Sequence, residues 1–103
     1  MIQLVVFVPM SHIEKVKAAM FAAGGGKIGN YDSCCFEHPG TGQFRPLAGS
    51  KPFIGSAGAI ERVEEMRLEL TCEDHLFAAV VKAMKGAHPY ETPAYYGIKT
   101  VEH

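Results

Sequence analysis

Residues 65–72 read Glu-Met-Arg-Leu-Glu-Leu-Thr-Cys, and this strict alternation of polar and apolar side chains decides the fold. A period of two predicts a half-buried strand with one polar face, which is typical of an antiparallel sheet. We interpret the charges from Glu61 to Glu69 as a solvated strand face, with ion pairs between subunits as the alternative. The apolar residues that would share the other face are Met66, Leu68, Leu70 and Cys72.

The N-terminal part of the chain predicts a strand and a helix. The run Ile2–Val8 is apolar and rich in β-branched residues, which indicates a buried strand. Ser11 and Glu14 have the spacing of a capping box, and apolar residues at helical spacing follow them. We therefore expect a helix over residues 11–23, ended by the three glycines at 24–26.

The same order is repeated around residues 65–72. Residues 28–36 predict a second strand before them. Thr71 and Asp74 resemble a second N-terminal cap, and the apolar spacing after them predicts a helix over residues 72–86. Residues 95–101 predict the last strand.

Between the two halves lies a stretch rich in glycine and proline, residues 38–58, which we call the arm. A structureless loop of this length would be unusual in a compact domain. Its interspersed apolar residues predict instead a hairpin or an ordered arm that buries something. These residues are Phe44, Leu47, Phe53 and Ile54.

This order predicts an α+β, ferredoxin-like βαββαβ fold in a single domain, residues 1–103. It consists of an antiparallel sheet with two helices on one face and a long hairpin arm. The other face of the sheet has no helix and carries Val5 and Phe7 beside its charges. A partly apolar open face usually meets a partner, so we expect a homo-oligomer.

Composition excludes several classes of function. The 103 residues carry a formal net charge of −1, which attracts neither nucleic acid nor an anionic membrane. The longest apolar run, Leu4–Met10, is far too short to span a bilayer. No secretory leader is visible, and three cysteines do not make a disulfide framework. A reducing cytoplasm is therefore the expected location.

The candidate site lies in residues 87–95, Ala-His-Pro-Tyr-Glu-Thr-Pro-Ala-Tyr, which we call the proline-framed segment. Each proline fixes its own φ and favours an extended residue before it, so the segment should be stiff. It would hold His88, Tyr90 and Glu91 in place. Either these three groups form a binding site, or the segment is a rigid lead into the last strand that packs at a subunit contact.

Other polar residues could join this site. Asn30 and Tyr31 stand at the start of the expected second strand, and we expect them, with His38, beside the proline-framed segment. For a metal the candidates are His88, His38 and Cys34, because imidazole and thiolate bind divalent ions. Cys34 and its neighbour Cys35 would point to opposite faces of a strand and cannot easily share one ion. The alternative for both cysteines is a small buried hydrophobe.

Five blocks of sequence together resemble one known pattern. It is the insert domain found inside bacterial members of the Nif-three-like family, and the chain resembles a stand-alone version of it. The resemblance covers nearly the whole chain and implies the ferredoxin-like, trimer-forming architecture of CutA and PII-like proteins. A trimer is therefore expected over a dimer. The blocks are residues 27–36, 40–46, 52–55, 61–67 and 87–95, and His88-Pro89-Tyr90-Glu91 also looks like a CutA segment.

The resemblance also limits the function. The two-metal site of the full-length family belongs to an outer domain that these 103 residues do not represent. No hydrolase or cyclohydrolase activity is carried over, and we assign no catalytic residue. We expect a non-enzymatic, oligomeric binding or regulatory module for a small ligand or a partner protein. The alternative is a divalent metal protein of the copper type resembling CutA, which rests on five histidines, three cysteines and the CutA-like block.

Overall fold

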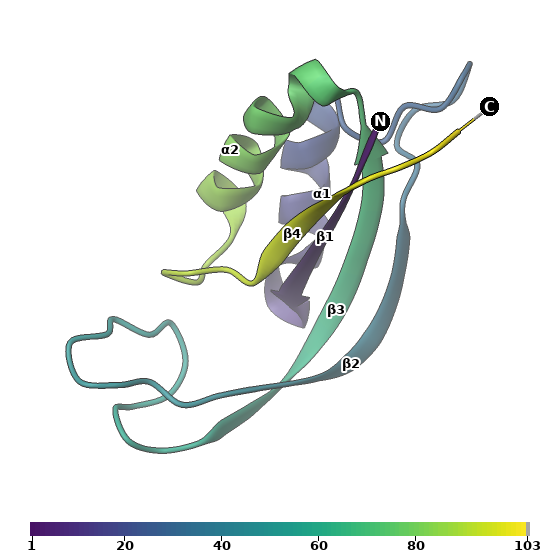
Figure 1. Ribbon diagram of the computed structural model, residues 1–103. Helices are drawn as coiled ribbons and strands as arrows, with labels where there is room; N and C mark the ends of the chain where they lie inside the picture. The colour runs from purple at the N-terminus through teal and green to yellow at the C-terminus, as the bar shows by residue number, and fades with distance from the viewer. Residues whose placement is uncertain (103) are drawn as a thin grey trace.

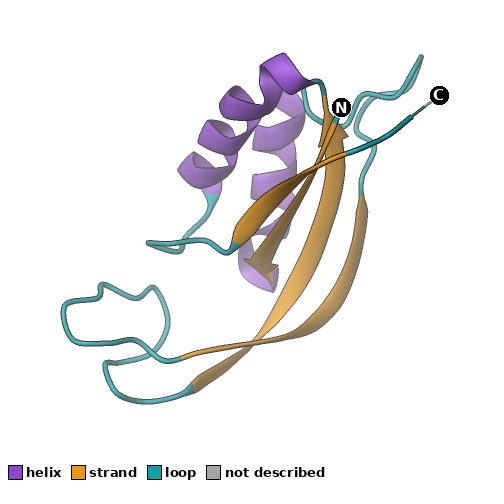
Figure 2. Ribbon diagram, viewed as in Figure 1, coloured by secondary structure: helices purple, strands orange, loops and turns teal. Residues whose placement is uncertain are grey.

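The computed structural model describes residues 1–102, and it has the expected α+β architecture. Four strands form one antiparallel sheet in the order β2-β3-β1-β4. Figure 1 shows the strands, and Figure 2 shows both helices against one face of the sheet. The strands are β1 (Ile2–Pro9), β2 (Phe36–Phe44), β3 (Glu61–Cys72) and β4 (Tyr95–Lys99); the helices are α1 (Ile13–Ala22) and α2 (Phe77–Ala87), preceded by the 3-10 turns η1 (Met10–His12) and η2 (Asp74–Leu76).

The core lies between the helices and the apolar face of the sheet. β1 and β3 are in register through Leu4 with Leu70 and Val6 with Leu68. Their side chains meet Val16 and Met20 of α1 and Val80 and Met84 of α2, and every one of these residues is buried. The alternation expected in residues 65–72 is therefore confirmed, since Met66, Leu68, Leu70 and Cys72 all pack against this core.

The expected strand at residues 28–36 is wrong, because β2 begins at Phe36. Residues 28–31 form a tight turn closed by two hydrogen bonds between Ile28 and Tyr31, of 2.9 and 3.0 Å. Gly29 has φ of 55°, a left-handed conformation that a strand cannot contain and that glycine tolerates. The strand runs instead through Pro39 and two glycines, which β2 accepts because it lies at the edge of the sheet.

The expected helix starts also need correction, although both helices exist. Neither Ser11 nor Thr71 caps a helix, since each helix is preceded by a 3-10 turn whose N-cap makes no side-chain hydrogen bond. The end of α1 agrees with the prediction. Gly24, at φ 104°, donates to Phe21 and Gly25 donates to Met20, which is a Schellman motif.

The arm is ordered, as expected, and extends the β2–β3 hairpin beyond the rest of the sheet. Pairing continues as far as Phe44 with Glu61, and the loop between them curls back below the segment that leads into β4 (Figure 1). The helix-free face, which we call the open face, exposes Phe36, Tyr96 and Ile98 at 62%, 42% and 47%. In the described part of the chain, no helix is long and apolar enough to cross a membrane.

Candidate functional site

The proline-framed segment follows α2 directly, and its first turn is locked by backbone geometry. α2 ends at Ala87 because His88 precedes Pro89 and is extended, with φ −75° and ψ 135°. The amide of His88 still donates to the carbonyl of Met84 at 2.9 Å, so the segment leaves the helix at a defined angle. The extended conformation expected for His88 is confirmed.

His88 is a buried residue that holds the segment against the end of β1. Its Nε2 donates to the carbonyl of Phe7 at 2.7 Å, and its Nδ1 accepts from the amide of Tyr90 at 3.1 Å. A carbonyl only accepts, so the proton is on Nε2. Nδ1 is itself an acceptor and carries no proton, so the ring is neutral. Burial lowers the pKa of His88, although the Phe7 carbonyl opposes that shift.

Tyr90 connects the segment to the arm and to β3. Its ring packs on His88 at 4.9 Å between centroids and on Phe44 and Phe53 at 5.9 and 6.5 Å. Its hydroxyl donates to Oε2 of Glu65 at 2.7 Å. Burial and the neighbouring carboxylate both raise the pKa of Tyr90, so the phenol stays protonated at neutral pH.

These contacts enclose a pocket of about 250 Å³ between the arm, β1 and the proline-framed segment. Its apolar walls are formed by Phe7, Phe44, Pro46, Pro52, Phe53, Ile54 and Ala94. Its polar groups come from Gln43, Ser50, Glu65, Tyr90, Glu91 and Thr92. An apolar hollow with a few polar groups is the usual form of a small-molecule site.

Glu91 ties the tip of the arm to the proline-framed segment. Its Oε2 accepts a hydrogen bond from the backbone amide of Lys51 at 3.0 Å, across 40 residues of sequence. The arm is thus attached to the segment through Glu91 and through the packing of Phe44 and Phe53 on Tyr90. Of the three candidates in the segment, Tyr90 and Glu91 line the pocket, and His88 lies behind Tyr90.

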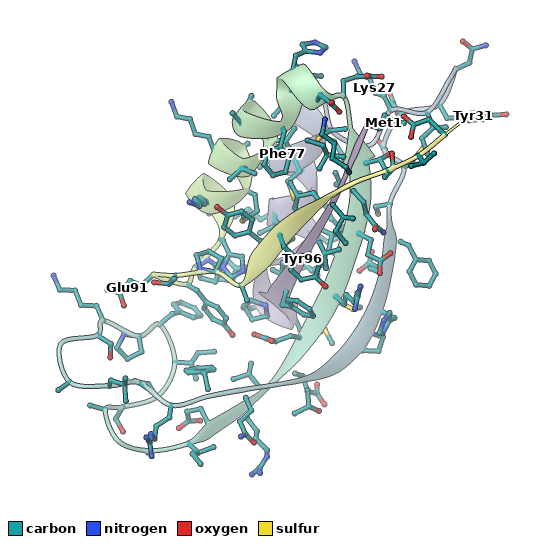
Figure 3. All side chains as sticks on the ribbon, viewed as in Figure 1. Met1, Lys27, Tyr31, Phe77, Glu91 and Tyr96 are labelled. Carbon is teal, nitrogen blue, oxygen red and sulfur yellow. The ribbon has the colours of Figure 1, made fainter. Side chains whose placement is uncertain are left out.

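The other candidates lie elsewhere in the described chain. Asn30 and Tyr31 belong to the turn that follows α1, and Figure 3 shows Tyr31 and Glu91 at opposite ends of the molecule. The expected proximity of Asn30 and Tyr31 to the segment is therefore wrong within one chain. His38 is exposed on β2, where its ring lies 6.1 Å from Phe36, and its partner across the strands is Arg67.

The metal candidates are not gathered in one place. Among residues 1–102, no group of three or more histidine, cysteine or acidic side chains could hold an ion. Cys34 donates to the backbone oxygen of Asp32 at 3.5 Å, and both ring nitrogens of His88 are already bonded to backbone. A metal on His88 would have to displace one of these bonds. The donor set of His88, His38 and Cys34 therefore does not fit a metal in this arrangement.

Sequence reasoning missed two groups that the structure places in the site. Glu65 was interpreted as part of a solvated face, yet it is 8% exposed and forms part of the pocket wall. Phe44 and Phe53 were expected to help an ordered arm bury another surface, and the structure shows that both line the pocket. No local signal could have found Glu65, because its burial depends on the pairing of β3 with β2, in which Gly40 is its partner.

Comparisons with known proteins agree with this fold. No family model matches the chain. The chain is 50% identical over 91 residues to the GTP cyclohydrolase 1 type 2 homolog of Mycobacterium leprae. The matched region covers 88% of this chain and 24% of that protein. A crystal structure of a Bacillus cereus protein related to NIF3 superposes with a TM-score of 0.80 and 46% identity, over 93% of this chain and 24% of that one.

The chain is therefore similar in sequence and in fold to one part of NIF3-related proteins. It spans about a quarter of the length of the NIF3 relatives that it matches. The fold is also shared with CutA1 from Pyrococcus horikoshii, at a TM-score of 0.70 and 20% identity over all of this chain and 86% of that one. Both parts of the expected resemblance, to the Nif-three-like family and to CutA, are thus confirmed.

Proposed function

We propose that this chain is a non-enzymatic, ligand-binding module of the NIF3 type that acts as a homo-oligomer. The observation that carries the proposal is the pocket enclosed by the arm and the proline-framed segment. Tyr90 and Glu91 would contact the ligand, and His88 would position Tyr90. The relatives named for GTP cyclohydrolase activity are about four times as long as this chain, and that activity is not part of the proposal.

The open face supports the oligomeric part of the proposal. Phe36 and Tyr96 lie in one row across the sheet, joined through Glu69 and Val5. Ile98 lies one row further along, opposite Gln3. Exposed apolar side chains gathered on one face favour burial against another copy. A trimer is the state we expect, by analogy of fold with the CutA structures.

The metal-binding alternative has less support. The backbone hydrogen bonds of His88 and the separation of His38 from it offer a divalent ion no ready ligand set. The pocket, in contrast, needs no rearrangement to accept a small molecule.

The test is a fragment screen followed by nuclear magnetic resonance (NMR), with two matched variants. Phe53 and Ile28 are both 51% exposed, but only Phe53 lines the pocket. Fragments that bind wild type and Ile28→Ala, and that lose affinity for Phe53→Ala, would support the proposal. Fragments whose affinity Phe53→Ala leaves unchanged would place the ligand elsewhere, and the absence of any binding at millimolar concentration would contradict the proposal.

A further inference from the structure

The charge of the pocket wall is one-sided. Glu65 and Glu91 are its charged residues, and no lysine, arginine or histidine is found among the described residues that line it. Lys85 lines a separate cavity of about 150 Å³ beside it, and its ammonium group lies 5.1 Å from the centre of the Tyr95 ring. A ligand in the larger pocket would therefore meet negative charge and no positive side chain.

Of the two carboxylates, Glu65 should attract a positively charged ligand more strongly, because it is buried without a counter-charge. It is 8% exposed, and the ion pairs of residues 1–102 do not include it. One phenol, that of Tyr90, donates to its Oε2, and no hydrogen bond from the described residues reaches its Oε1. A buried carboxylate is costly unless it is paired with a cation. The described residues of this wall provide no such cation, so a cationic ligand would lower that cost.

Its neighbour Arg67 does not supply that partner. Arg67 lies on the same face of β3, but its Nε donates to Glu69 at 2.8 Å. Its guanidinium also lies over the ring of Phe7, 6.0 Å from the centroid. Arg67 is thus paired with Glu69 and does not line the pocket, so it is not the counter-charge of Glu65.

The aromatic rings of the pocket favour the same kind of ligand. Phe7, Phe44, Phe53 and Tyr90 all line it. The face of an aromatic ring attracts a cation, and it also packs against a flat apolar body. The volume of about 250 Å³ lies just below the range usual for drug-sized ligands, which indicates a small molecule.

We propose that this pocket selects a small organic cation, an amine or amidine carried on a flat apolar body, with Glu65 as its counter-charge. The proposal rests on the proposed function, because it names the ligand class of the same pocket. It argues against phosphate-bearing ligands, since an anion would face two carboxylates in a wall that offers no basic side chain.

Three probes of one shape and different charge test the proposal. Benzamidine is a cation at pH 7.5, benzamide is its neutral counterpart and benzoate is an anion. NMR titration of the wild-type protein should give an affinity for benzamidine at least about tenfold above that for benzamide, or about 1.4 kcal/mol. Benzoate should bind more weakly than either.

Two variants distinguish the charge of Glu65 in the pocket from the net charge of the protein. Glu65→Gln should lower the affinity for benzamidine about tenfold and leave that for benzamide unchanged. Glu64→Gln removes the same charge from the adjacent exposed position, outside the pocket, and should change neither. A loss of benzamidine affinity in both variants to the same extent would overturn the assignment to Glu65.

The possible failures are distinguishable from failure of the proposed function. Equal binding of benzamide and benzamidine would overturn the selection of cations and leave the pocket as a ligand site. If none of the three probes binds, the present proposal fails, and the fragment screen with Phe53→Ala decides the proposed function independently.

Discussion

The hydroxyl of Tyr90 donates a hydrogen bond of 2.7 Å to the carboxylate of Glu65, which lies 25 residues earlier in the chain. This bond joins the proline-framed segment to β3 on the open face of the sheet. Glu65 is buried, so the bond satisfies an acceptor that water reaches poorly. The position of the Glu65 carboxylate in the pocket therefore depends on the hydroxyl of Tyr90.

Tyr90→Phe is therefore expected to reduce the free energy of unfolding by about 1–3 kcal/mol, because it leaves a buried carboxylate oxygen without its donor. Urea denaturation at pH 7 measures the loss. Tyr31→Phe is the matched control, since Tyr31 is 75% exposed, and it should stay within about 0.5 kcal/mol of wild type. Similar losses in the two variants would mean that the bond to Glu65 contributes nothing to stability.

The buried, neutral His88 makes stability depend on pH. Burial lowers its pKa below the reference value of about 6.5, so the unfolded chain takes up the proton first. Its contribution is fully present above pH 6.5 and decreases as pH falls below that value, by at most about 1.4 kcal/mol per pH unit. Urea titrations between pH 5 and pH 8 measure this slope.

His88→Gln should flatten that pH dependence while lowering stability throughout, because the ring contacts to Tyr90 are lost. His38→Gln serves as the control, since His38 is exposed, and it should keep the wild-type slope. An unchanged slope in His88→Gln would show that the pH dependence arises from another group.

Large-to-small changes in the core should be costly. Leu68 and Val80 are fully buried between the sheet and α2, so Leu68→Ala and Val80→Ala should each lower the free energy of unfolding by about 2–4 kcal/mol. Leu47→Ala, at a position 63% exposed in the arm, should change it by less than about 0.5 kcal/mol. Losses below about 0.5 kcal/mol at both core sites would contradict the assigned core.

The sequence predicts the fold of this chain better than it predicts the site. Alternation in residues 65–72 and helical spacing before Gly24 are local signals, and both elements form where those signals indicate. The second strand was misplaced because Pro39 and the glycines beside it indicate a turn. An edge strand tolerates them, and sequence alone does not reveal which strand will lie at the edge.

The site depends on contacts between distant residues, which local patterns cannot show. The proline-framed segment was identified from its own composition. Its partners Glu65 and Lys51 come from parts of the chain 25 and 40 residues away. The alternation that identifies β3 also assigns Glu65 to a polar face, and the fold of the arm over that face turns an exposed position into a buried one.

The oligomer should depend on the open face. Ile98→Glu would place a charge among the apolar side chains that we propose to be buried between copies, at a cost that favours dissociation. Light scattering should then give the monomer mass of 11.2 kDa, whereas wild type gives a multiple of it. Ile28→Glu is the control, because Ile28 is exposed to a similar extent on the turn after α1. A wild-type mass of 11.2 kDa at micromolar concentration would refute the oligomer.

Two glycines of β2 provide a sharp test of the position of Glu65. A β-carbon added to Gly42 would clash with Oε1 of Glu65, whereas one added to Gly40 would meet nothing within 4 Å. Gly42→Ala must therefore push the carboxylate away from Tyr90, and we expect a loss of about 1–3 kcal/mol in urea denaturation together with weaker binding of benzamidine. Gly40→Ala restricts the unfolded chain without a clash, so it should be neutral or stabilise by about 0.4–1 kcal/mol. Because the two residues lie on the same strand and undergo the same change, equal effects would show that Glu65 does not occupy the space above Gly42.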